Sequence, residues 1–179
     1  TFEGSPVFSA PYPYHLANCG DFDICGFKRP QSYYRDLLWC IRTAPFIGVH
    51  DPKHHGKRLG ISPWAWEPVI DSWTFPGQEG NPTRVDVYAI DDEVELLING
   101  VSVGRKQAGS ANRNMATFEV NYQPGTIEAV GYTNGKETER IGLKTASSPA
   151  AMELIADRTA LKADYGDLAY VTIKVSDKA

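Results

Sequence analysis

The sequence is poor in the residues that build disulfide frameworks and metal centres. Among its 179 residues are only three cysteines, Cys19, Cys25 and Cys40, and four histidines. An odd number of cysteines cannot all pair within one chain, and their spacing is not that of a zinc site. We expect reduced cysteines that serve as packing residues, with a Cys19–Cys25 disulfide as the alternative. No cofactor motif is present, and no cofactor is expected.

Long apolar runs and a surplus of positive charge are also missing. No apolar segment approaches the roughly 20 residues that a membrane-spanning helix needs, so no membrane span is expected. The formal net charge of −4 provides no electrostatic attraction for nucleic acid or an anionic membrane. The chain starts at Thr1, without an initiator methionine or a recognisable signal peptide. These features suggest a processed or cut chain and leave its cellular compartment open.

Short alternating strands and turns are what the sequence has in abundance. It contains 16 glycines and 12 prolines, and its hydrophobic fraction of 42% is enough for a packed core. Alternating strand positions in the stretch 84–103 are apolar: Val85, Val87, Ala89, Val94, Leu96 and Ile98. This period predicts strands with one face towards a core and the other, which includes Asp86 and Tyr88, towards water. Asn99-Gly100 tolerates the positive φ of a tight hairpin turn.

The same pattern continues towards the end of the chain. Further strands are predicted at 118–122, 126–132 and 141–143, with turns at Pro124-Gly125 and Asn134-Gly135. About seven short strands in a row are typical of an immunoglobulin-like β-sandwich, which we assign to 61–147. Residues 148–179 predict two or three more strands, too few for a sandwich core. We interpret them as the truncated start of a further β domain, so the expected fold class is mainly β.

The first part of the chain predicts a loop followed by one helix. Prolines, glycines and aromatic residues in 1–28 indicate an irregular loop whose aromatic side chains need a partner surface. An apolar stripe at helical spacing runs through 30–42, with Pro30 in the first turn and Pro45 beyond the end. We expect this helix to pack against another element.

The segment 46–60 is predicted to be a polar linker. His50, Asp51, His54 and His55 invite the hypothesis of a metal site, but nothing in their spacing fixes a ligand geometry. A solvated loop is the favoured interpretation, and no metal is expected.

Three tryptophans, Trp64, Trp66 and Trp73, follow in the proline-rich stretch 61–83. Exposed tryptophans can stack on sugar rings, which makes these three the candidates for sugar contacts. Tryptophans in such a linker also anchor it against neighbouring domains, and that is the favoured interpretation. A carbohydrate-binding or adhesion module is the alternative function that follows from the first interpretation.

Four stretches together resemble glycoside hydrolase family 2, particularly its β-galactosidase-like members. GDFDICGFKRPQSYYRDLLW, residues 20–39, looks like the end of the catalytic (β/α)8 barrel. Residues 72–106 and 118–137 look like the domain that follows the barrel, and 151–175 is similar to the start of the next immunoglobulin-like domain. The resemblance implies that 1–45 is the last loop and helix of a barrel.

For the full-length protein, the resemblance implies retaining hydrolysis of a β-galactoside or another β-linked sugar. The family uses two barrel glutamates, and a retaining pair lies about 5–5.5 Å apart. Neither maps onto this sequence, which has no Asn-Glu pair. We therefore expect an inactive, structural portion of a glycosidase without catalytic residues. Its expected partner is the rest of the parent hydrolase, and a homo-oligomer interface is a further option.

Overall fold

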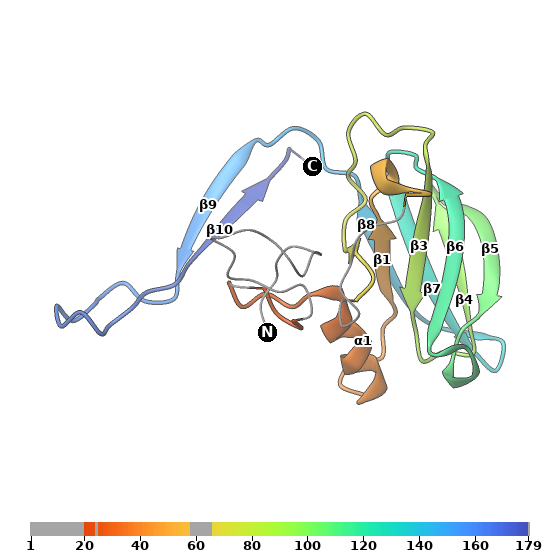
Figure 1. Cartoon of the computed structure of the whole chain (residues 1–179), viewed down its shortest axis with the longest axis horizontal. Helices are drawn as coiled ribbons and strands as arrows, with labels where there is room; N and C mark the ends of the chain where they lie inside the picture. Colours follow the sequence, from red (N-terminus) through yellow and green to blue (C-terminus); the bar gives the residue numbers. More distant parts are fainter. Residues whose placement is uncertain (1–19, 24, 58–65, 179) are drawn as a thin grey trace. The chain divides into compact units, whose positions relative to one another are not determined.

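The computed structural model describes residues 20–23, 25–57 and 66–178, and the chain divides after residue 145 into two compact units. Figure 1 shows the elements along the chain. They are α1 (Pro30–Leu38), β1 (Phe46–His50), η1 (Pro52–His54), β2 (Val69–Ile70), β3 (Pro82–Tyr88), β4 (Glu93–Ile98), β5 (Val101–Gln107), η2 (Ser110–Asn112), β6 (Met115–Asn121), β7 (Thr126–Thr133), β8 (Lys136–Lys144), β9 (Ala151–Ala156) and β10 (Val171–Ser176). None of the helices among the described residues is long and apolar enough to cross a membrane.

The first unit is a sandwich of two four-stranded antiparallel sheets. One sheet has the order β2-β1-β3-β6 and the other the order β5-β4-β7-β8. The alternating apolar residues of β3 and β4 meet between the sheets, together with Trp73, Phe118 and Tyr122, all at most 5% exposed. The expected mainly β, immunoglobulin-like sandwich is confirmed, and β7 lies inside its sheet, between β4 and β8.

The two Asn-Gly turns have the predicted left-handed backbone. Asn99 and Gly100 have φ values of 51° and 77°, and Asn134 and Gly135 have values of 52° and 74°. Two consecutive positive φ angles match the twist of the flanking strands, so each pair closes a tight hairpin. The first turn joins β4 to β5, and the second joins β7 to β8.

The outer face of β3 is buried, contrary to the expectation from its alternating pattern. Asp86 and Tyr88 were expected to face water, yet both are 0% exposed. A second apolar cluster covers this face, built from Leu37 of α1, Phe46 of β1, Val69 and Tyr88. Because the covering helix precedes the strand by some fifty positions, the alternation within β3 carries no signal of it.

The predicted linker at 46–60 begins with a strand instead of a loop. Phe46–His50 forms β1, which pairs with β3 in the register Gly48↔Asp86. Four of its five residues are buried. Its short run of apolar residues contains a glycine and precedes the polar histidine segment, which explains why the sequence pattern suggests a linker.

Helix α1 ends at Leu38, four residues before the predicted end. The N–H of Ile41 donates to Asp36 O, and the N–H of Cys40 donates to Leu37 O, which is a Schellman motif. Cys40 takes its left-handed position with φ 55°. Both Cys25 and Cys40 are free and exposed, so the expectation that these two are packing residues is wrong. Cys19 lies outside the described residues.

The second unit consists of the hairpin β9–β10. The two strands pair antiparallel, with Leu154 opposite Ile173. Apolar side chains on both of its faces are between 46% and 69% exposed: Met152, Leu154, Ile155, Val171, Ile173 and Val175. A two-stranded hairpin has no second layer to cover them, as the prediction of an incomplete β domain implies.

A close contact between Asp91 and Gly131 ties the β3–β4 connection to β7. Asp91 is 5% exposed, and its Oδ1 accepts hydrogen bonds from Thr138 Oγ1 at 2.6 Å and Thr133 Oγ1 at 3.3 Å. Its Oδ2 has no hydrogen-bond donor among the described residues. A Cβ at position 131 would lie 2.5 Å from this oxygen and 2.7 Å from Thr138 Oγ1. Only glycine therefore fits beside the carboxylate.

We predict that Gly131→Ala lowers the free energy of unfolding by about 1–3 kcal/mol, because the new methyl group overpacks a buried site. Urea unfolding followed by tryptophan fluorescence measures this, since all four tryptophans precede residue 145. Gly142→Ala on the adjacent strand is the matched control. Its Cβ would meet the flexible Glu128 side chain at 3.3 Å, so we expect a cost below about 1 kcal/mol. Equal costs for both variants would contradict the proposed packing.

Candidate functional site

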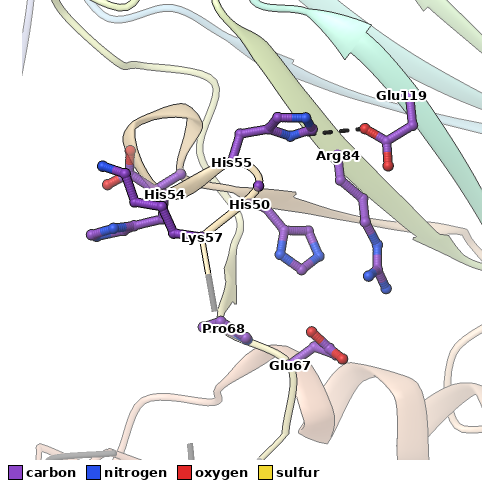
Figure 2. A pocket seen from close by; sticks show the side chains of 10 residues that line it. His50, His54, His55, Lys57, Glu67, Pro68, Arg84 and Glu119 are labelled. Atoms are coloured by element: carbon purple, nitrogen blue, oxygen red, sulfur yellow. Dashed lines mark ion pairs between the residues drawn. The ribbon is translucent and has the colours of Figure 1, made fainter. Parts of the chain in front are cut away.

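A hollow of about 400 Å³ lies beside η1 on the first unit. Figure 2 shows the side chains of its wall. His50 comes from β1, His55 and Lys57 from the turn after η1, Arg84 from β3 and Glu119 from β6. Both basic and acidic side chains therefore line the hollow, which suits a polar ligand better than an apolar one.

Two of the lining side chains, Arg84 and His50, are held by the Asp86 carboxylate, which is itself 0% exposed. Arg84 binds it through two atoms, with Nε 3.0 Å from Oδ1 and Nη2 2.9 Å from Oδ2. Thr117 Oγ1 donates to Oδ1 at 2.7 Å, and His50 Nε2 lies 2.8 Å from Oδ2. Since a carboxylate only accepts, His50 carries a proton on Nε2. Three strands thus contribute donors to one buried charge.

Two opposing effects act on the pKa of Asp86. Burial raises it, whereas the hydrogen bonds from His50, Arg84 and Thr117 lower it and outweigh burial, so the net pKa is lowered. For Arg84, burial lowers the pKa, but the hydrogen bond to Asp86 and its negative charge outweigh burial, so the net pKa is raised. Both groups are therefore ionised at neutral pH, and the Asp86 carboxylate holds Arg84 and His50 in position at the hollow.

Three of the four residues of the metal-site hypothesis, His50, Asp51 and His55, have separate contacts in the structure. His50 is bound to Asp86, and Asp51 Oδ1 caps η1 by accepting the Lys53 N–H at 3.0 Å. His55 Nδ1 lies 3.9 Å from Glu119 Oε2. Within the part of the chain that the structure describes, no three His, Cys, Asp or Glu side chains are placed to hold a metal ion.

Two of the three tryptophan candidates have their rings against protein. Trp73 is 1% exposed, donates from Nε1 to Gln123 O at 2.9 Å and contacts the Tyr122 ring edge-on. It has no free ring face, so a sugar contact through Trp73 does not fit this structure. Trp66 is half-buried, and its Nε1 donates to Tyr88 Oη at 2.8 Å. Trp64 lies outside the described residues.

The residues that sequence reasoning missed are Arg84, Asp86 and Glu119. Two of them carried a usable signal. Asp86 is a charged residue between two buried valines of a strand, Val85 and Val87, and Arg84 lies two positions away on the same face. A charge in such a place is either solvated or paired, and Arg84 supplies a partner. Glu119 carries no comparable signal, because it lies on an ordinary alternating strand.

One family model and two curated relatives match this chain. A family model described as "Domain of unknown function (DUF4982)" matches residues 80–139. A putative beta-glucuronidase of Formosa agariphila is 30% identical over 93% of this chain and 14% of its own length. The beta-galactosidase BoGH2A of Bacteroides ovatus is 29% identical over 93% of this chain and 17% of its own length.

Solved structures give the same result. A glycosyl hydrolase family 2 member from Bacteroides cellulosilyticus matches 93% of this chain and 23% of its own, with 36% identity and a TM-score of 0.77. A beta-glycosidase from Bacteroides vulgatus matches 89% of this chain and 17% of its own, with 26% identity and a TM-score of 0.61. The resemblance to the C-terminal part of family 2 glycoside hydrolases is therefore confirmed. The chain spans less than a fifth of the curated relatives it matches.

We predict that Asp86→Asn lowers the free energy of unfolding by about 3 kcal/mol at neutral pH, because Arg84 loses its buried partner charge. The folded pKa of Asp86 lies below its ordinary value of 3.8. Its contribution is therefore complete above about pH 4 and is lost as the pH falls through the folded pKa. The difference in urea unfolding between wild type and variant should shrink accordingly. Exposed Asp71→Asn is the control, and a pH-independent difference for Asp86→Asn would contradict the linkage.

Proposed function

We propose that this chain is the non-catalytic C-terminal portion of a β-galactosidase-like family 2 glycoside hydrolase. The observation that carries the proposal is the coverage: nearly the whole chain aligns with less than a quarter of each relative described above. The parent protein would hydrolyse β-glycosidic bonds with retention, through two glutamates on its barrel. The role of this portion is structural, and its partner is the barrel.

The segment 20–41 supports this role because its apolar side chains differ in exposure. Leu37 of α1 is 0% exposed, in the cluster that also contains Tyr88 of β3. Large apolar side chains of the same segment are between 45% and 69% exposed: Phe22, Phe27, Leu38, Trp39 and Ile41. Exposed apolar side chains gathered in one short segment are typical of an interaction face. We assign it to the rest of the barrel.

The sandwich fixes the position of this face through aromatic contacts. Tyr33 of α1 stacks on Phe46 with ring centroids 4.5 Å apart, and Phe46 stacks on Tyr88 at 5.6 Å. Tyr34 Oη donates to Arg113 O at 2.8 Å. These contacts join the helix to β1, β3 and the loop before β6. The sandwich would thus act as a rigid support for the last helix of the barrel.

We expect no turnover when the isolated chain is assayed on an aryl β-galactoside and an aryl β-glucuronide. The reason is that the two barrel glutamates of the family have no counterpart in this sequence. An intact family 2 relative assayed in parallel serves as the positive control. Turnover at enzyme-like rates that copurifies with the chain would overturn the non-catalytic assignment.

Two adjacent leucines of α1 test the barrel contact. In the isolated chain, Leu37→Ala should cost about 2–5 kcal/mol, whereas Leu38→Ala should cost less than about 0.5 kcal/mol because it is exposed. In a chimera that carries this chain in place of the matching segment of the Bacteroides cellulosilyticus enzyme, both substitutions should lower the unfolding midpoint. A chimera that folds and is insensitive to Leu38→Ala would exclude this face as the barrel contact.

A further inference from the structure

The sequence contains two Asn-Gly pairs, and the structure places them in equivalent turns. Asn99 and Asn134 have φ values of 51° and 52°, the following glycines have values of 77° and 74°, and all four residues are exposed. An asparagine followed by glycine is chemically labile, because no side chain shields the glycine nitrogen from the asparagine Cγ. The two sites therefore share sequence, backbone and solvent access, and they differ in what holds the amide.

The side-chain amide of Asn99 is held at both of its polar atoms. Oδ1 accepts the N–H of Thr126 at 2.8 Å, and Nδ2 donates to Pro124 O at 3.1 Å. Gly125 lies so close to this amide that no Cβ would fit between them. Turning the Asn99 Cγ towards the Gly100 nitrogen would break both hydrogen bonds.

The side chain of Asn134 has no such restraint among the described residues. The hydrogen bond that the structure gives this residue outside the strand ladder comes from its backbone N–H, which donates to Asp92 Oδ2 at 2.8 Å. Its amide group is free to rotate about the Cα–Cβ and Cβ–Cγ bonds. The attacking geometry is therefore accessible at Asn134 without the loss of a side-chain contact.

We propose that Asn134-Gly135 is a site of spontaneous deamidation in the folded protein, and that Asn99-Gly100 is protected. The Gly135 backbone nitrogen attacks Asn134 Cγ and loses its proton, and the side-chain nitrogen leaves as ammonia. A five-membered succinimide results. Water then opens either of its carbonyl groups, which yields aspartate or isoaspartate. The reaction consumes one water, releases one ammonia and involves no oxidation.

The surroundings of Asn134 give the modification a structural consequence. A new carboxylate would lie next to Asp92, which binds the backbone N–H of residue 134, and near the buried Asp91. Like charges at this distance repel each other. Isoaspartate also adds a backbone carbon to a two-residue turn, which disturbs the pairing Thr133↔Lys136. The modified protein should therefore be less stable, with one additional negative charge.

The test is to incubate the folded chain in mildly alkaline buffer and to follow both asparagines by peptide mapping and mass spectrometry. We expect Asn134 to convert about tenfold faster than Asn99, because two hydrogen bonds of ordinary strength must break before Asn99 can react. In denaturant both sites should convert at similar rates, which separates the effect of structure from that of sequence.

Two further measurements complete the experiment. Asn134→Asp should reproduce the charge shift on ion exchange, and Asn134→Ser should abolish the fast phase of ammonia release while Asn99→Ser leaves it unchanged. Equal rates at the two sites in the folded chain, or faster conversion at Asn99, would overturn the proposal. It is independent of the proposed glycosidase role, since the assay requires no substrate.

Discussion

The buried carboxylate of Asp86 is the constraint on which the first sheet depends. An ionised group without contact to water must find all its partners within the protein, and here they come from three strands: His50 from β1, Arg84 from β3 and Thr117 from β6. Asp86 is opposite Gly48 on one side and Thr117 on the other. A slip of one residue would turn every side chain to the other face and leave the charge unpaired. The carboxylate therefore specifies register, whatever its net contribution to stability.

Tyr88 lies two positions after Asp86 on the same face of β3, and its contacts link the strand to α1. Burial raises the pKa of its hydroxyl far above the usual range, and the hydroxyl accepts the indole N–H of Trp66. Its ring stacks on Phe46, which in turn stacks on Tyr33 of α1. One strand thus carries an electrostatic contact at the hollow and an aromatic contact under the helix. The same strand therefore contacts both the residues of the hollow and the residues that pack against α1.

The features predicted correctly from the sequence are those that local patterns determine. Alternation in β4 and the Asn-Gly pairs at 99 and 134 identified strands and hairpins, because pleat and turn geometry are properties of neighbouring residues. The predictions were wrong where segments far apart in the sequence determine whether a side chain is buried. Asp86 and Tyr88 look solvent-facing in the sequence, but side chains of the neighbouring strands bind Asp86, and the cluster that contains Leu37 of α1 covers Tyr88. Trp73 was expected to anchor a proline-rich linker against a neighbouring domain or to contact a sugar. Its ring instead lies in the core of the sandwich, where it contacts Tyr122 and donates to Gln123 O. The hollow combines residues from four separated segments, and no spacing rule unites them.

Two groups of exposed apolar side chains among the described residues differ in how their backbone is held, and this difference bears on the proposed role. The first group lies on and beside α1, whose backbone is fixed by a Schellman motif, an aromatic stack and a hydroxyl bond to Arg113. A surface that is already ordered pays little conformational entropy when a partner binds it. The β9–β10 hairpin has no packed layer of its own, so its order must come from whatever covers it. If the chain supports a barrel, the preformed face of α1 is where that support is transmitted. Substitutions inside the sandwich should then affect the parent enzyme by changing the contacts that position this helix.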